Sequence, residues 1–219
     1  MVAELQKEGE FSMSRYTGPK CRKCRQYGMV LCTKPANKCA WEKRKSPPGD
    51  KSPLSQRRRP SEYGMQLKEK QKARFIYGLV EKQFRNYFKK AISTPGITGD
   101  NLMSLLEQRL DNVVYRLGFA DSRHQARQII NHGHIQVDEQ KVNSPSYQVN
   151  IGQKISWTEK SKKSKLQSII KSESGKNAII PNWLKVDTTK LEGEAIASPS
   201  VDDFDPNIDR MQIIEYYSR

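Results

Sequence analysis

The sequence predicts an α+β fold: a mainly helical N-terminal domain with a four-cysteine metal knuckle, and a module in which a helix hairpin precedes a small antiparallel sheet. Three observations lead to this prediction. Apolar residues recur every three or four positions from Ala73 to Ala91 and from Leu102 to Leu117, which is typical of amphipathic helices. From Ile135 to Trp157 apolar and polar residues alternate between turn-forming residues, as in strands. Four cysteines lie close together near the N-terminus.

The cysteine segment predicts a metal site. Its spacing is Cys-x2-Cys-x7-Cys-x6-Cys, formed by Cys21, Cys24, Cys32 and Cys39. Two thiolates two residues apart can face one ion and four can close a tetrahedral site, for which zinc is the default ion. The segment has too little apolar surface to fold alone, so metal binding would supply much of its ordering free energy. Free thiols and two disulfides are the alternatives, and the lack of an apolar signal peptide argues against disulfides.

A basic connector and the longest helical pattern follow. Residues 45–60 are rich in Pro, Ser and charge and cannot bury enough surface to hold one shape alone. Arg57, Arg58 and Arg59 suit a polyanion backbone, although a solvated linker is an equally ordinary interpretation. The aromatic residues of the pattern at 73–91 lie on its apolar stripe, which favours core positions over stacking platforms for a ligand. Gly78 marks close packing or a bend, and Thr94-Pro95-Gly96 ends the pattern.

Two helices should open the module. The first has Leu102 to Leu117 on its apolar stripe, Asp100 as its N-cap and Gly118 as its end. The second begins with a capping box at Ser122 and ends at Gly133. Its polar face has two rows, which are Arg123, Arg127 and Asn131 beside His124, Gln128 and His132.

No Asp or Glu lies between Ser122 and Val137 to compensate the two rows. Adjacent donors without carboxylates favour a phosphate-rich partner, and a solvated helix face is the alternative. After the sheet, a lysine-rich stretch at 160–165 leads to Leu166 and Ile169, as a short helix or a further contact. Alternation from Ile213 to Tyr217 predicts a final strand.

The charge balance also favours a polyanionic partner. The 219 residues include 39 Lys and Arg against 24 Asp and Glu, a formal net charge of +15. From Asp187 onward there are eight acidic and three basic residues, so the preceding 186 residues carry +20 and should meet the polyanion. No run of 18 apolar residues is present, and we expect a cytoplasmic protein without a membrane partner or a small-molecule substrate.

The module resembles a known family. The stretch RLDNVVYRLGFADSRHQARQIINHGHIQVDEQKVNSPSYQVNIGQKI is similar to the RNA-binding module named after the fourth protein of the small ribosomal subunit. The flanking YGMQLKEKQKARFIYGLVEKQFRNYF, the opening SRYTGPKCRKCR and the closing IIEYYSR resemble the bacterial form of that ribosomal protein family. The resemblance runs from about Met13 to Arg219. It implies that the module is inserted into a larger domain and that the C-terminal segment packs back on the helical region.

The resemblance also implies a function. Family members are structural ribosomal proteins of the cytoplasm and not enzymes. They bind small-subunit rRNA early at a junction of several helices, nucleate subunit assembly, and line the channel where mRNA enters, beside neighbouring small-subunit ribosomal proteins. Some keep four cysteines here with zinc, or in some cases with an iron–sulfur cluster. We therefore expect a ribosomal location and the same partners for this chain.

These interpretations divide the chain into a disordered extension at 1–12, the metal knuckle at 13–45, the connector and helical domain at 46–99, the RNA-binding module at 100–175 and the C-terminal segment at 176–219. The candidate RNA contacts are cationic or polar side chains spread over these parts: Arg15, Lys20, Arg22, Lys23, Arg57, Arg58, Arg59, Lys68, Lys70, Lys72, Arg74, Arg85, Arg109, Arg116, Arg123, His124, Arg127, Gln128, Asn131, His132 and His134.

Two other classes of function are less well supported by the sequence. An RNA-modifying enzyme can carry this kind of module as an accessory, but the rest of the chain shows no phosphate-binding glycine loop, and its three histidines lack a convincing carboxylate partner. A zinc-containing nucleic-acid-binding regulator fits the charge and the cysteines. It would need dimerisation heptads that the sequence lacks, and the helix hairpin resembles the RNA module more than a DNA reader.

Overall fold

The computed structural model describes residues 16–34, 36–49, 61–162, 180–187 and 190–219. Arg15, Arg57, Arg58, Arg59, the extension at 1–12 and the lysine-rich stretch after Lys162 lie outside the described residues. The helices are α1 (Lys20–Tyr27), η1 (Ala36–Lys38), α2 (Ala40–Lys43), α4 (Glu62–Ile76), α5 (Glu81–Ser93), α6 (Thr98–Glu107), α7 (Leu110–Arg116), α8 (Arg123–Asn131), α9 (Glu159–Lys162), η2 (Val201–Asp203) and α11 (Arg210–Tyr217). The strands are β1 (Ile135–Val137), β2 (Gln140–Lys141), β3 (Lys154–Trp157), β4 (Leu184–Asp187) and β5 (Glu192–Ala195).

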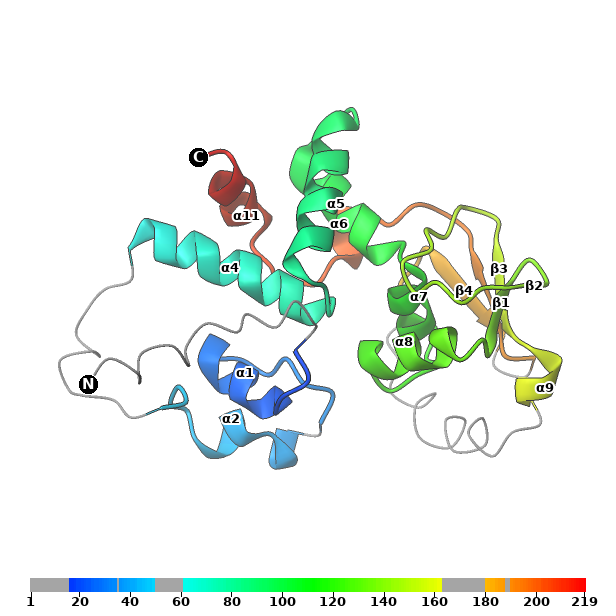
Figure 1. Cartoon of the computed structure of the whole chain (residues 1–219), viewed down its shortest axis with the longest axis horizontal. Helices are drawn as coiled ribbons and strands as arrows, with labels where there is room; N and C mark the ends of the chain where they lie inside the picture. The colour runs from blue at the N-terminus through cyan, green and yellow to red at the C-terminus, as the bar shows by residue number, and fades with distance from the viewer. Residues whose placement is uncertain (1–15, 35, 50–60, 163–179, 188–189) are drawn as a thin grey trace, which may run out of the picture.

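The predicted α+β class is confirmed, with helices gathered around one core and a sheet at the other end of the molecule (Figure 1). The helical core combines α4, α5, α6 and α11 through residues such as Phe84, Leu102 and Ile213. The second core lies between α7, α8 and the sheet, and includes Leu110, Ile130 and Trp157. The change from one core to the other therefore falls between α6 and α7, a few residues after the boundary expected at 99/100.

The long helix expected through Gly78 is two helices, α4 and α5. Gly78 has φ +63°, a left-handed conformation that glycine adopts without the penalty of a Cβ atom. The predicted bend is therefore a complete break. The end of α5 at Ser93, just before Thr94-Pro95-Gly96, is as predicted.

The helix expected from Leu102 to Leu117 also breaks, at Gln108 and Arg109. Arg109 is extended as the N-cap of α7 and forms an isolated bridge with Gln148, so the chain cannot continue one helix through it. The predicted N-cap was also wrong. Asp100 lies in the first turn of α6, whose N-cap is Ile97, and its carboxylate pairs with Arg210.

The start and end of α8 agree with the sequence prediction. The Ser122 hydroxyl accepts a hydrogen bond from the Gln125 amide at 3.3 Å. The Gln125 side chain accepts a hydrogen bond from the amide of Asp121, the residue before the N-cap, so the arrangement resembles a capping box displaced by one residue. Gly118 and Gly133 both adopt left-handed conformations just after α7 and α8.

The sheet is antiparallel, with strand order β2-β1-β3-β5-β4. Its two last strands come from the C-terminal segment, and Lys154 of β3 pairs with Glu194 of β5. The expectation that this whole segment returns to the helical domain is therefore wrong for its first half. Its second half does return: Phe204 and Ile208 enter the helical core, and α11 packs against α4 and α6 (Figure 1).

The strand predicted at the C-terminus is wrong, because α11 is a helix. The Asp209 side chain accepts hydrogen bonds from the amides of Met211 and Gln212, which starts the helix. Tyr217 then stacks on Phe88 with ring centroids 4.3 Å apart. Ile213 is buried in the helical core and Tyr217 is half-buried against it, which explains the apolar residues that the alternation assigned to a strand.

Candidate nucleic-acid interface and metal centre

The cysteine cluster is built from α1 and the loop that follows it. The Sγ atoms of Cys21, Cys32 and Cys39 all lie within 4.8 Å of one another. Cys24 is one turn along α1 from Cys21, and its Sγ accepts a hydrogen bond from the Leu31 amide at 3.3 Å. Thiolate donors at this separation, with a backbone N–H directed at a sulfur, fit a bound metal ion.

The thiols interact strongly without a cation. Burial raises the pKa of Cys32 to about 12, and its hydrogen bonds with Cys39 and Cys24 act in the same direction. Burial also opposes ionisation of Cys39, but backbone hydrogen bonds from Trp41 and the bond with Cys32 give it a lowered pKa. Cys32 Sγ donates a hydrogen bond to Cys39 Sγ at 3.6 Å. A cation at this position would allow both to ionise.

Burial removes several predicted RNA contacts from the surface. Lys70, Lys72, Arg109 and Arg127 are all less than 9% exposed. A buried charge needs a counterion, and each of these side chains has one. Their amines and guanidiniums therefore face the protein interior and are not accessible to an RNA partner.

Asp111 is the carboxylate that pairs with both arginines. It contacts Arg109 Nη2 at 2.7 Å and Arg127 Nη2 at 3.0 Å. Arg127 Nη1 also donates to the Gly78 carbonyl at 2.8 Å. Since Gly78 joins α4 to α5 and Arg127 lies on α8, this bond ties the helical domain to the module.

The two lysines pair within the helical domain. Lys70 Nζ lies 2.8 Å from Glu81, across the break between α4 and α5, and 4.6 Å from the centroid of the Tyr216 ring. Lys72 Nζ lies 2.7 Å from Glu69. The sequence analysis had counted both lysines among the RNA contacts, and each is instead paired with a glutamate.

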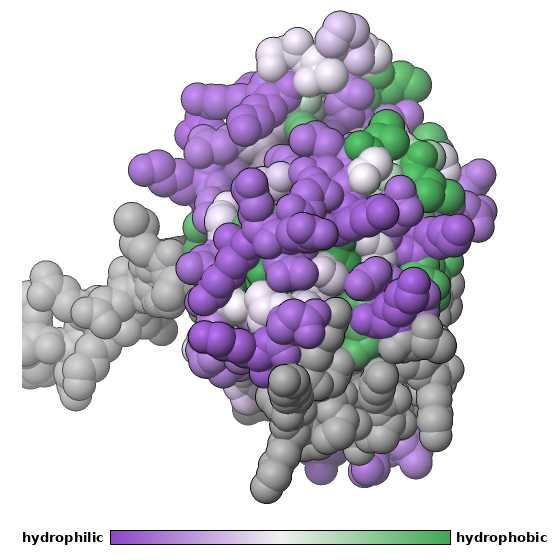
Figure 2. All heavy atoms as spheres, turned by 90° about the vertical axis from the view of Figure 1, so that its right-hand side faces the viewer, coloured by the Kyte–Doolittle hydropathy of each residue, from purple (hydrophilic) through white to green (hydrophobic). Residues whose placement is uncertain are grey.

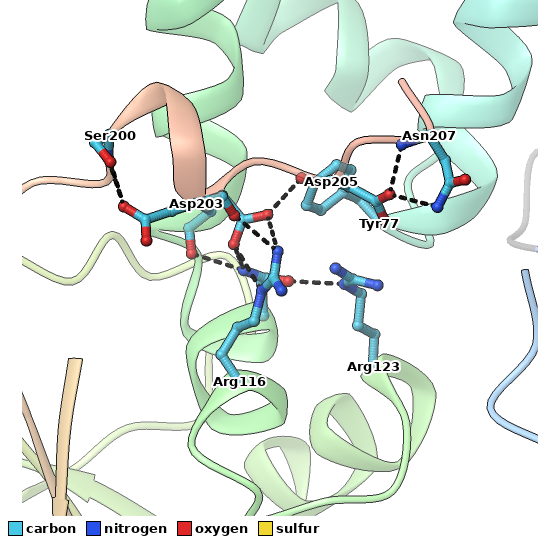
Figure 3. Close-up of polar contacts among 9 residues, drawn as sticks. Tyr77, Arg116, Arg123, Ser200, Asp203, Asp205 and Asn207 are labelled. Carbon is cyan, nitrogen blue, oxygen red and sulfur yellow. Dashed lines mark hydrogen bonds and ion pairs between the residues drawn. The ribbon is translucent and has the colours of Figure 1, made fainter. Parts of the chain in front are cut away.

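A second buried network is centred on Glu107 (Figure 3). Its carboxylate accepts hydrogen bonds from Tyr77 at 2.6 Å, from Asn112 at 2.7 Å and from both Nε and Nη2 of Arg116. Burial opposes the charge of Arg116, but Glu107 outweighs it and raises the Arg116 pKa. Arg116 also donates to the Asp203 carbonyl at 3.2 Å. This predicted RNA contact is thus largely committed to joining α6, α7 and the C-terminal segment.

Arg123 differs from the other arginines of the module. Its guanidinium carbon lies 4.9 Å from the Tyr77 ring centroid and 4.8 Å from that of Tyr115. Its Nε donates to Asn112 Oδ1 at 2.7 Å. Within the part of the chain that the structure describes, no acceptor contacts its two terminal amino groups. Sequence reasoning missed these ring and amide partners, because Tyr77 and Tyr115 follow ordinary helical spacing.

Arg123 lines a cleft of about 210 Å³ between the knuckle, α4, the start of α8 and the loop after η2. Its lining residues are Lys20, Val30, Leu31, Cys32, Thr33, Phe75, Ile76, Tyr115, Ser122, Arg123, His124, Asp205 and Asn207.

The remaining predicted contacts are at least partly accessible. Arg22, Lys68, Arg85, Gln128, Asn131 and His132 are exposed, and Lys20, Lys23, Arg74 and His124 are half-buried. His134 is also half-buried, and its Nδ1 lies 2.8 Å from Ser161 Oγ. Burial and the nearby His132 and Lys141 lower the pKa of His134, which favours the neutral ring. Figure 2 shows a mainly hydrophilic surface over the module end of the molecule, broken by smaller apolar patches.

On α8, the two predicted rows are not equally accessible. Arg127 points inward, whereas Gln128, Asn131 and His132 face solvent. The exposed donors on this helix are therefore mostly neutral. Among the predicted contacts, the lysines and arginines that remain accessible lie on α1, α4 and α5, together with Arg123 at the cleft.

Comparisons with known proteins agree with this architecture. The Ribosomal protein S4/S9 N-terminal domain family matches residues 15–107 and the S4 domain family matches residues 108–155, so the family boundary coincides with the change of core. Small ribosomal subunit protein uS4 of Halothermothrix orenii is 48% identical over 211 residues, which cover 94% of this chain and all of the relative. The uS4 proteins of Desulforamulus reducens and Chloroflexus aurantiacus are 48% and 44% identical with the same coverage.

The family resemblance stated from the sequence is confirmed, and with it the expectation of a ribosomal protein. None of the helices in the described ranges has the length and apolar character needed to cross a membrane. The chain therefore belongs to the small ribosomal subunit protein uS4 family, whose members are structural proteins and not enzymes, and it carries an RNA-binding S4 domain.

Proposed function

We propose that this chain binds small-subunit rRNA early and directly, at a junction of several RNA helices, and thereby nucleates assembly of the subunit. In the assembled subunit it lies beside neighbouring ribosomal proteins and lines the channel through which mRNA enters. Membership of the uS4 family supports this proposal. The observation that carries it is the set of accessible cations on α1, α4 and α5, held on a body whose interior is fixed by buried ion pairs.

The mechanism is distributed neutralisation of phosphates. Arg22, Lys68 and Arg85 are exposed on three different helices. Each cation that meets a phosphate releases condensed counterions, so many weak contacts add up to tight binding. Because the positions of these helices are fixed by packing, the surface selects a folded RNA by its shape more than by its base sequence.

We also propose that the four cysteines hold one zinc ion, with an iron–sulfur cluster as the alternative. Cys24 would complete the set formed by Cys21, Cys32 and Cys39. A zinc ion supplies a structural cross-link here and no reaction chemistry. The protein's contribution is to place α1, with Lys20, Arg22 and Lys23 next to the cluster, in a fixed position for phosphate contact.

Competition binding tests the proposed function. The full-length metallated protein is mixed with labelled small-subunit rRNA, and duplex DNA serves as competitor at moderate salt. We expect the rRNA to remain bound, with affinity falling by roughly 0.7 to 0.9 log units per phosphate contact for each log unit of salt.

A matched pair of variants locates the surface. The double substitution Arg22→Gln and Arg85→Gln should weaken rRNA binding and lower its salt slope by about 2. Lys185→Gln, an exposed change on β4, is the control and should leave both unchanged. Equal affinity for rRNA and duplex DNA would refute the proposal.

A further inference from the structure

The cleft between the knuckle, α4 and α8 has the form of a small-ligand site. Leu31, Phe75 and Ile76 provide apolar lining, whereas Lys20 and Arg123 supply positive charge. A concave apolar surface with a few convergent polar groups is the usual design of such sites. A volume of about 210 Å³ accepts one nucleobase and excludes a base pair.

The Arg123 guanidinium is pre-organised to bind an anion. Two tyrosine rings cover its guanidinium, and Asn112 engages its Nε, so the side chain loses little freedom when a ligand arrives. Its terminal amino groups form no hydrogen bond within the described residues. A planar pair of donors of this kind matches two oxygens of a phosphate. Lys20 lines the same cleft and also has no acceptor in the described part of the chain.

The Asp205 carboxylate lets the cleft distinguish between nucleobases. Its Oδ1 accepts hydrogen bonds from the Asn207 amide at 3.1 Å and from the Asn207 side chain at 2.9 Å, which fixes the carboxylate at the rim (Figure 3). A carboxylate accepts a hydrogen bond from the exocyclic amino group of adenine, cytosine or guanine. Uracil has no exocyclic amino group, and its imide N–H lies between two keto oxygens that repel a carboxylate, so Asp205 favours this base least.

We propose that the cleft binds one unpaired nucleotide of the RNA partner. Its phosphate contacts Arg123 and Lys20, its base lies against Phe75, and an exocyclic amino group of the base donates to Asp205. Recognition of splayed-out bases by aromatic side chains is common in RNA-binding proteins. This inference rests on the proposed function and adds a nucleotide subsite to a surface otherwise made of phosphate contacts.

Nucleoside 5′-monophosphates test the subsite directly. Saturation-transfer NMR is recorded on AMP, CMP, GMP and UMP with the full-length metallated protein. We expect binding of the three amino-bearing nucleotides and about tenfold weaker binding of UMP, since one charge-assisted hydrogen bond is lost. Asp205→Asn should reduce this difference, because the amide can also donate to a keto oxygen.

Substitutions of the cations separate the subsite from general attraction to anions. Arg123→Gln and Lys20→Gln should each weaken AMP binding about tenfold or more. Lys20 has no described polar partner, so its variant keeps the test valid if Arg123→Gln unfolds. Lys185→Gln, an exposed change on β4 that removes the same charge, is the control and should leave AMP binding unchanged.

The two proposals fail in different ways. If rRNA is bound selectively but no monophosphate binds, or if AMP binding survives both cation substitutions, the nucleotide subsite is wrong and the proposed function stands. If rRNA is not preferred over duplex DNA, the proposed function fails, and the monophosphate titration still decides whether the cleft takes a nucleotide.

Discussion

Asp111 is the most informative residue for the stability of the module. It is 2% exposed and binds Arg109, which is fully buried, through two hydrogen bonds of 3.0 Å and 2.7 Å. It also contacts Arg127 at 3.0 Å. Asp111→Asn keeps the shape of the side chain but removes its negative charge. Among the described residues no other carboxylate contacts Arg109, so its guanidinium would remain buried with neutral partners alone, the Tyr87 hydroxyl and the new amide oxygen.

The size of the effect follows from desolvation. Removing one partner of a buried ion pair costs about 3–5 kcal/mol, because the other charge stays buried without compensation. We therefore expect the free energy of unfolding of Asp111→Asn to fall by about 3–5 kcal/mol. For a chain of this length each 1 kcal/mol lowers the Tm by about 2–4 °C, which gives a total decrease of about 6–20 °C.

Thermal unfolding followed by circular dichroism and urea titration at neutral pH measure this loss. Asp202→Asn is the matched control, because Asp202 is exposed on η2, and it should stay within about 0.5 kcal/mol of the wild type. A loss of less than 1 kcal/mol for Asp111→Asn would show that Arg109 finds water or another anion, and it would refute the interpretation of a buried charge that depends on Asp111.

The other predictions concern the metal, pH and a glycine. Chelation should lower the Tm and increase amide exchange in α1, and Cys39→Ser should reproduce both effects without chelator, as metal analysis and hydrogen exchange would show. Burial raises the pKa of Glu81, but its hydrogen bond and attraction to Lys70 outweigh burial and lower it below the unfolded value, so this contribution to stability is lost as the pH falls through the folded pKa. Urea titrations from pH 6 to pH 3 should therefore show a smaller acid loss in Glu81→Gln. Gly78→Ala, at φ +63°, should lower the free energy of unfolding by about 1–2 kcal/mol in the same titration, whereas an unchanged value would mean that the α4–α5 turn relaxes.

Local signals in the sequence were sufficient for the fold class and for several helix ends. The Ser122 cap, the Gly133 end and the cysteine spacing each act over a few residues, and the structure contains all three features. The breaks at Gly78 and Arg109 could not be found in this way, because apolar spacing continues through both positions. What breaks the helix at Arg109 is the isolated bridge to Gln148, which lies 39 residues away.

Whether a cationic side chain is buried or exposed depends on partners that are distant in the sequence or that helical spacing does not predict. Lys70 and Glu81 are eleven residues apart and meet only because the chain turns at Gly78. Arg109 and Asp111 are close in sequence, but residues two apart on a helix do not face each other, so helical reasoning gives them no contact. They meet because Arg109 is extended before α7 begins. A row of charges in the sequence therefore shows which cationic residues are present, but not which of them are exposed to solvent.

This division of the cations determines how the protein responds to salt. Salt screens exposed charges strongly and buried pairs much less. The pairs at Asp111 and Glu107 hold the module against the helical domain from the inside, whereas Arg22 and Lys68 are exposed. Raised salt should therefore release RNA while the arrangement of the two domains persists. On this reasoning we expect the proposed RNA surface to keep its shape without RNA, so that the same pattern of charges is present before other partners bind.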